Sequence, residues 1–218
     1  MNAWEAGQGR SPLDRALCLL WAAGFGDAPV NWPLTKRDRA LLELRRHTLG
    51  DELTLLTECP ACSAELEMDV TISDLLPALT VPEPEDVETD GRTIRIRPLT
   101  SADLAVASTE PGSCVAEVIR VRLAGDVPPD AIAEIDTRIE ALAARGELQL
   151  ALTCLDCGAQ WSEPLDVAGL VWREIEAVAR RTLGEVAELA RAFGWSEVQS
   201  LSLSPQRRSA YLSLARAT

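Results

Sequence analysis

The chain contains the pattern Cys-x-x-Cys twice, at Cys59–Cys62 and at Cys154–Cys157. Each copy follows a run in which apolar residues alternate, as they do in half-buried strands. When Cys59 is aligned with Cys154, the two copies stay in register without a gap as far as Leu75 and Leu170. The offset of 95 residues therefore indicates an internal duplication of a strand–knuckle–strand unit.

The spacing of the cysteines favours a metal site. Two intervening residues let both sulfurs of a pair face one point, and the small residue that follows (Ser63 or Gly158) permits a close backbone approach. One knuckle supplies two thiolates, and two knuckles supply the four that a tetrahedral structural zinc requires. We therefore predict one structural Zn²⁺ in a zinc ribbon split by an insertion of about 90 residues, with the ligands Cys59, Cys62, Cys154 and Cys157.

Other interpretations of the cysteines are less favoured. They could act as small buried apolar residues, or one pair could be a redox dithiol. A redox pair usually occurs once, at the start of a helix, whereas both pairs here are flanked by strand patterns. His47 is the one histidine, and with four thiolates available we expect it to be a cation near a helix C-terminus.

The remaining patterns predict an α+β fold that is mostly helical, with helices inserted between the knuckles and a helical C-terminal region. The expected segments are an N-terminal helical segment (1–50), the first zinc knuckle (51–76), an acidic, proline-rich linker (77–92), a strand plus helical insertion (93–146), the second zinc knuckle (147–168) and C-terminal helices (169–218).

Helix starts and one long helix are predicted from local signals. Residues that favour an N-cap precede the apolar stripes, at Ser11, Thr35, Ser73, Thr100 and Ser204. From about Val167 to Phe193 the apolar residues follow one face of a single helix, which Gly194 is expected to end.

The net charge of −13 is concentrated in one part of the chain. Residues 51–90 contain 12 acidic side chains and no lysine or arginine. We expect the stretch 82–88 to be a solvated linker; the alternative is an acidic surface that attracts a basic partner or keeps other proteins away. In either case the negative electrostatic field of this stretch repels phosphate backbones, which argues against nucleic-acid binding.

Several classes of protein are disfavoured by what the sequence lacks. It has no Gly-x-Ser-x-Gly, no phosphate-binding glycine loop and no His-Glu-x-x-His, and four cysteines would leave a zinc ion no open position, so we expect no enzyme. The first residues do not resemble a secretory signal, and the longest apolar run, 16–26, is too short to cross a membrane. Cysteines in metal spacing suit a reducing compartment, so we expect a cytoplasmic protein with no membrane partner.

Further motifs, together with the paired knuckles, carry a resemblance to a known family. They are Gly9–Leu17, Leu99–Leu104, Val171–Glu176, Phe193–Glu197 and Leu203–Leu212. With these motifs the chain resembles the baseplate hub assembly chaperones of T-even phages, in the variety encoded beside sheath, tube and spike genes in bacterial contractile injection systems. The resemblance spans most of the chain and is strongest in the C-terminal 70 residues, which contain Gly-Trp-Ser and Ser-Pro-x-Arg-Arg.

The resemblance implies a non-enzymatic role in assembling baseplate hub or spike proteins, and only the four cysteines are transferred as site residues. The leading hypothesis is an assembly chaperone or adaptor that acts through its helices, with zinc holding the two halves together. A permanent baseplate component is a second hypothesis. The third is a zinc-ribbon module for nucleic acid or transcription machinery, which predicts a basic face near the knuckles.

Overall fold

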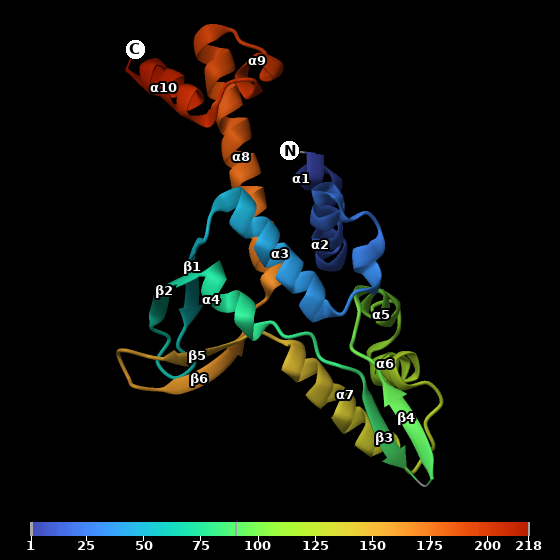
Figure 1. The fold of residues 1–218 in the computed structure, drawn as a ribbon. Coiled ribbons are helices and arrows are strands. Elements are labelled where there is room, and N and C mark those ends of the chain that lie inside the picture. The colour runs from blue at the N-terminus through green and yellow to red at the C-terminus, as the bar shows by residue number, and fades with distance from the viewer. Residues whose placement is uncertain (1, 90, 218) are drawn as a thin grey trace.

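The computed structural model describes residues 2–89 and 91–217, and it confirms a mostly helical α+β fold with small antiparallel sheets (Figure 1). The helices are α1 (Asn2–Gly7), α2 (Pro12–Leu20), α3 (Leu34–Leu49), α4 (Ile72–Leu75), α5 (Ser101–Ala107), α6 (Val115–Ala124), α7 (Ile132–Gly146), α8 (Val167–Phe193), α9 (Glu197–Leu201) and α10 (Pro205–Arg216). The strands are β1 (Glu52–Glu58), β2 (Glu65–Thr71), β3 (Glu85–Thr89), β4 (Arg92–Ile96), β5 (Gln149–Thr153) and β6 (Gln160–Pro164). Short turns of other helix types are η1 (Trp21–Phe25), η2 (Ala28–Asn31), η3 (Leu76–Ala78) and η4 (Gly112–Cys114).

A main core forms where α2, α3 and the first half of α8 pack together. Its most buried side chains include Leu20, Leu41, Leu42 and Val171. β1 adds its inward-facing leucines to this core, and the residue before β5, Leu148, adds another. Both knuckle units are thus anchored in the same core, although they lie far apart in the sequence.

The strands form three separate two-stranded antiparallel sheets within the described residues. β1 pairs with β2 from Glu52 opposite Thr71 to Glu58 opposite Glu65, and β5 pairs with β6 from Gln149 opposite Pro164 to Thr153 opposite Gln160. Each of these two hairpins carries one knuckle at its tip, as the duplication predicts.

A second core lies in the insertion. β3 and β4 pair with each other and pack with α6 and α7 around Ile96 and Ile135, both fully buried. The expected linker is therefore partly structured: residues 85–89 form β3, with Val87 buried. Asp86 and Glu88 are exposed to solvent, whereas Val87 between them faces the core. The acidic composition of the segment therefore hides the alternation that is typical of a strand.

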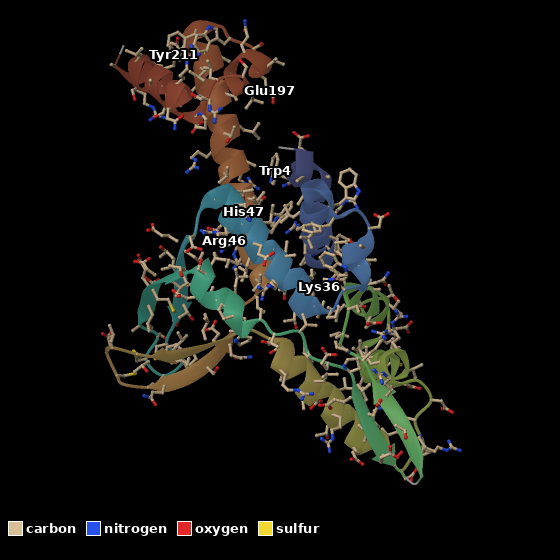
Figure 2. The ribbon with its side chains drawn as sticks, viewed as in Figure 1. Trp4, Lys36, Arg46, His47, Glu197 and Tyr211 are labelled. Atoms are coloured by element: carbon tan, nitrogen blue, oxygen red, sulfur yellow. The ribbon has the colours of Figure 1, made fainter. Side chains whose placement is uncertain are left out.

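The long helix α8 runs from the main core to a small C-terminal head formed with α9 and α10 (Figure 1). Leu189 and Leu212 are buried there, and stacked and edge-on aromatic contacts join Phe193, Trp195 and Tyr211. As predicted, α8 ends at Gly194, which adopts a left-handed conformation with φ of 70°. Tyr211 and Glu197 mark this head in Figure 2.

Most predicted caps are present, and two are wrong. Ser11, Thr100 and Ser204 each accept a hydrogen bond from the backbone at the start of their helices. α3 instead begins after Pro33, and the Thr35 hydroxyl donates to the Gly146 carbonyl oxygen at 2.9 Å. α4 is capped by Thr71, while Ser73 lies inside that helix.

None of the helices in residues 2–89 and 91–217 is both long and apolar enough to cross a membrane.

Candidate metal centre

Each knuckle is closed by the same two backbone hydrogen bonds. In the first, the Cys59 N–H donates to the Ala64 carbonyl at 2.9 Å and the Ser63 N–H donates to the Cys59 carbonyl at 2.9 Å. In the second, the bonds from Cys154 to Ala159 and from Gly158 to Cys154 measure 2.9 and 3.0 Å. The duplicated sequence therefore builds a duplicated loop.

The residue after each cysteine pair has a left-handed backbone. Ser63 has φ of 58° and Gly158 has φ of 74°. This conformation turns the chain back into β2 and β6 and suits glycine better than a residue with a side chain. Ser63 is the one non-glycine residue with positive φ among the described residues, so the first knuckle carries backbone strain that the second does not.

The two hairpins bring all four cysteine sulfurs together, with every Sγ within 4.8 Å of the others. The shortest separations join the two hairpins: Cys59 Sγ to Cys157 Sγ is 3.7 Å, and Cys62 Sγ to Cys154 Sγ is 3.6 Å. Four thiolates around a zinc ion with Zn–S bonds of about 2.3 Å would have sulfurs about 3.8 Å apart in a regular tetrahedron. The four cysteines therefore fit a tetrahedral metal ion, and they are consistent with a metal site.

Burial and pKa differ among the four cysteine side chains. Cys59 and Cys154 are buried, and Cys62 and Cys157 are exposed. Burial raises the pKa of Cys59, but N–H groups of Ala61 and Cys62 and the neighbouring sulfurs outweigh it and lower the pKa to about 7. The Ala64 N–H lowers the pKa of Cys62, but the sulfurs of Cys157 and Cys154 raise it to about 12. Four ionised thiols at this spacing would repel one another, and a divalent cation would remove that repulsion.

A hydrogen bond near the knuckles ties the two hairpins together. The Thr57 hydroxyl of β1 donates to Glu163 Oε2 of β6 at 2.7 Å, and the Trp161 indole N–H reaches the same oxygen at 3.4 Å. Glu163 was not predicted as a site residue. The duplication offers a signal in retrospect, because Glu163 in the second copy aligns with Met68 in the first. A carboxylate in the second copy thus replaces an inward-facing apolar side chain of the first.

His47 lies near the end of α3, exposed and outside the cysteine cluster (Figure 2). Among the described residues, the four cysteines are the one group of three or more potential ligands close enough to hold a metal ion. The centre thus offers four sulfur donors, a set typical of closed structural sites.

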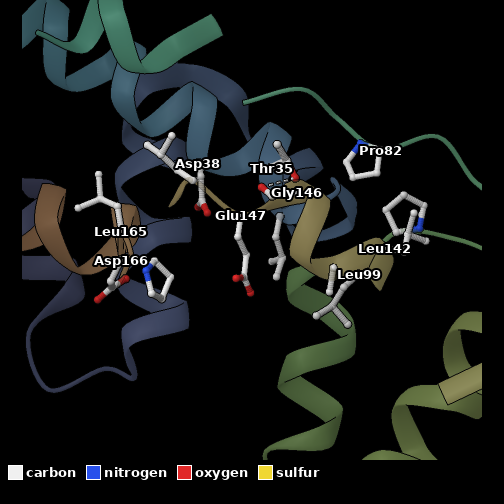
Figure 3. Close-up of a pocket in the computed structure, with 14 residues that line it drawn as sticks. Thr35, Asp38, Pro82, Leu99, Leu142, Gly146, Glu147, Leu165 and Asp166 are labelled. Carbon is white, nitrogen blue, oxygen red and sulfur yellow. Dashed lines mark hydrogen bonds between the residues drawn. The ribbon is translucent and has the colours of Figure 1, made fainter. Parts of the chain in front are cut away.

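A pocket separate from the cysteine cluster lies where α3, the end of α7 and the start of α8 meet (Figure 3). It has a volume of about 280 Å³ and mostly apolar walls, with the carboxylates of Asp38, Glu147 and Asp166 at its edge. Burial raises the pKa of Asp38, although its ion pair with Arg37 at 2.7 Å opposes the shift. Asp166 accepts the Gly169 N–H at 2.9 Å as the cap of α8. Glu147 accepts a hydrogen bond from the Gln149 side-chain amide at 3.1 Å. All three carboxylates thus have structural partners.

Comparison with known families gives one match. Residues 22–121 match the family model described as "T4 bacteriophage base plate protein". The matched stretch runs from η1 into α6 and contains the first knuckle, whereas the second knuckle and the C-terminal motifs lie outside it. No curated protein and no solved structure gave a significant match. The match supports a baseplate-related phage protein.

Proposed function

We propose that this chain is a non-enzymatic assembly chaperone or adaptor for the hub or spike of a phage-tail-like contractile baseplate, with one structural Zn²⁺ on Cys59, Cys62, Cys154 and Cys157. The observation that carries the proposal is the baseplate match over residues 22–121. The chaperone role is more specific than this match, and it is supported by the motif resemblance in the C-terminal region.

The metal part of the proposal is supported by the convergence of two hairpins from distant parts of the chain. Zinc is the metal that sulfur-only tetrahedral sites most often hold, and an iron–sulfur centre is the other candidate for such a donor set. Four cysteine ligands would leave no position for water or substrate, so the ion would stabilise the fold and do no chemistry.

The adaptor part is supported by the shape of the molecule. The C-terminal head projects from the main core on α8 (Figure 1). Within the head, the apolar side chains of Val198 and Leu214 are exposed. Such a helical head can pack on another protein. The acidic first hairpin disfavours the nucleic-acid hypothesis, because it places negative charge beside the knuckle.

The test is a pull-down in cells that express the complete injection-system cluster, together with analysis of purified particles. A tagged chain should capture hub or spike proteins from the lysate and should be absent from finished particles, and deletion of its gene should prevent baseplate assembly. A stoichiometric band in purified particles would instead identify a permanent component. Failure to capture any baseplate protein would contradict the proposal.

A further inference from the structure

The two knuckle hairpins enclose a groove between β2 and β5. It has a volume of about 350 Å³ and is lined by residues 64–68 and 151–156. Leu66, Met68 and Leu152 contribute apolar surface, and Glu65 and Glu67 contribute acidic side chains. Leu155 at the tip of the second knuckle is 95% exposed, although it is a large apolar residue.

β2 is an edge strand on the side of this groove, because each hairpin has only two strands. In an antiparallel pair, alternate residues point their backbone groups at the partner strand and the others point outward. Two backbone hydrogen bonds fix this alternation for the first hairpin: the Ile72 N–H donates to the Asp51 carbonyl, and the Cys59 N–H donates to the Ala64 carbonyl. It follows that Glu65, Glu67 and Asp69 direct their backbone N–H and C=O groups away from β1.

The acidic side chains of β2 lack the counter-charges that another acidic strand of the same molecule has. In the insertion, Asp86 of β3 lies opposite Arg95 of β4, with an ion pair at 3.4 Å. In the first hairpin, Glu65 lies opposite Glu58, and Glu67 lies opposite Leu56. Like charges that face each other across a sheet are destabilising.

No ion pair involves Glu65 or Glu67 within residues 2–89 and 91–217, and residues 51–90 contain no cation. β2 therefore has backbone groups that are open to a further strand. Its side chains form an apolar row on one face and an acidic row, without cationic partners, on the other face. β4, by contrast, combines two buried isoleucines with Arg95 on its other face, and so offers an internal example of what pairs with an acidic strand.

We propose that the groove between β2 and β5 receives an extended segment of a partner protein as a third strand beside β2, and that apolar and basic residues alternate along this segment. Its apolar side chains would lie against Leu66 and Met68, and its basic side chains would lie beside Glu65, Glu67 and Asp69. Main-chain hydrogen bonds would provide affinity, and the alternation would provide specificity. A second copy of the chain is disfavoured as the occupant because its own knuckle region is acidic.

This inference rests on the proposed function only for the premise that the partner is a protein. A failed pull-down would remove the baseplate assignment and leave the groove untouched, whereas the binding experiment below tests the groove alone.

The experiment uses the full chain as purified and a synthetic heptapeptide in which arginine and isoleucine alternate, blocked at both ends. Two comparison peptides contain the same residues in separate blocks, or glutamate in place of arginine. Binding is measured by fluorescence anisotropy, and backbone amide exchange is followed by NMR. The alternating peptide should bind at least about tenfold more tightly than either comparison peptide. It should slow the exchange of the amides of Glu65, Glu67 and Asp69, and leave those of Thr54 and Leu56 on the outer edge of β1 unchanged.

A matched pair of charge reversals locates the site. Glu67→Lys should weaken binding about tenfold, because it places a cation beside the basic row. Glu117→Lys makes the same change of charge at an exposed position of α6 and should leave binding within about twofold. NMR spectra of both variants check that they stay folded.

Three results would overturn the inference. They are no binding of the alternating peptide at millimolar concentration, equal effects of the two charge reversals, and protection that appears on β5 or β1 in place of β2. Any of these would mean that the acidic row only discourages strands from pairing at this edge.

Discussion

At the scale of single residues, the duplication allows two equivalent backbone positions to be compared within one molecule. Ser63 and Gly158 close their knuckles with the same left-handed turn, with φ of 58° and 74°. A Cβ added at Gly158 would meet no atom within 4 Å, so the backbone conformation alone decides what a substitution costs.

We predict opposite effects of exchanging these residue types. Gly158→Ala should lower the free energy of unfolding by about 1 kcal/mol, because a side chain in this conformation is strained. Ser63→Gly should raise it by about 0.5 kcal/mol, since strain relief exceeds the added entropy of the unfolded chain. Urea unfolding of both variants and the wild type in the same buffer measures both changes. A loss of stability in Ser63→Gly would show that the serine side chain contributes a contact that outweighs its strain.

Asp103 is a fully buried carboxylate, and its interactions join three elements. Arg97, the residue directly after β4, donates two hydrogen bonds to it at 2.7 and 2.8 Å, and Arg122 of α6 donates a third at 2.7 Å. Thr100 completes the capping box of α5. Burial alone would raise the pKa of Asp103, but these donors outweigh it and hold the pKa well below the ordinary value of 3.8.

The lowered pKa of Asp103 gives a pH-dependent prediction. A carboxyl whose folded pKa is depressed stabilises the fold above its unfolded pKa, and this stabilisation is lost as the pH falls. Asp103→Asn should lower the free energy of unfolding by about 2 kcal/mol at pH 7. The difference between wild type and variant should shrink as the pH falls below 3.8. Asp86→Asn, in an exposed pair, is the control and should cost less than about 0.5 kcal/mol.

Denaturant unfolding at pH 7 and at several values below pH 4 measures this difference. Taking the difference between two proteins cancels the effect of acid on the proposed metal site, which both share. A constant difference across this range would contradict the assignment of a depressed pKa to Asp103.

At the scale of elements, the two longest helices are joined through Arg45 and Glu174. The buried Arg45 guanidinium of α3 donates to both oxygens of Glu174 on α8, at 2.9 and 2.7 Å. It also donates to the Gly50 carbonyl at 2.6 Å, where α3 ends and the first hairpin follows. One side chain therefore sets the positions of α3, α8 and the start of β1 relative to one another.

We predict that breaking this pair costs more than replacing it. Glu174→Met leaves a buried guanidinium without its partner and should lower the free energy of unfolding by about 3 kcal/mol. Arg45→Met together with Glu174→Met should cost less than the sum of the single variants, because no charge is then left buried. A double-mutant cycle by urea unfolding measures this coupling, and strict additivity would show that the pair does not act as a unit.

The elements also show where local sequence signals are sufficient. Ser11 and Ser204 cap helices as predicted, since the serine and the N–H groups that it binds are neighbours in sequence. Thr35 fails as a cap because a carbonyl 111 residues away, that of Gly146, takes its hydroxyl. Ser73 fails because its hydroxyl and amide both bind Asp51 across the hairpin base. A local pattern cannot anticipate partners that folding brings in from elsewhere.

At the scale of the whole molecule, the chain has two cores, and the main one depends on segments from both ends. The cysteine cluster was predictable because the spacing within each pair and the repetition of the pair are both written in the sequence. The separate core of the insertion was not predictable from the sequence. The reason is that β3 has an acidic composition, and its apolar side becomes apparent only from its pairing with β4. The hydrogen bond by which the Glu163 carboxylate joins the hairpins was likewise not predictable, because the alignment with Met68 marks the substitution and does not identify Thr57 as its partner.

The consequence of this arrangement is that the proposed metal would stabilise two distant segments together. β1 contributes Leu53 and Leu55 to the main core, and the second unit contributes Leu148. A metal held by Cys59 and Cys157 closes a loop of 98 residues, which makes the unfolded chain lose conformational freedom. Removing the ion should therefore loosen both hairpins at once, while the insertion core around Ile96 and Ile135 keeps its own packing.

We predict that Cys59→Ser and Cys154→Ser each abolish stoichiometric metal binding and lower the free energy of unfolding by more than about 3 kcal/mol. Cys18→Ser is the matched control, because Cys18 lies in α2 outside the cluster and should leave the metal content unchanged. Elemental analysis gives the metal content, and amide exchange reports each hairpin separately. Chelator treatment of the wild type should remove protection from β1–β2 and β5–β6 together. Protection that persisted in both hairpins without metal would mean that hydrogen bonds and core contacts alone hold them, and that the four sulfurs meet for another reason.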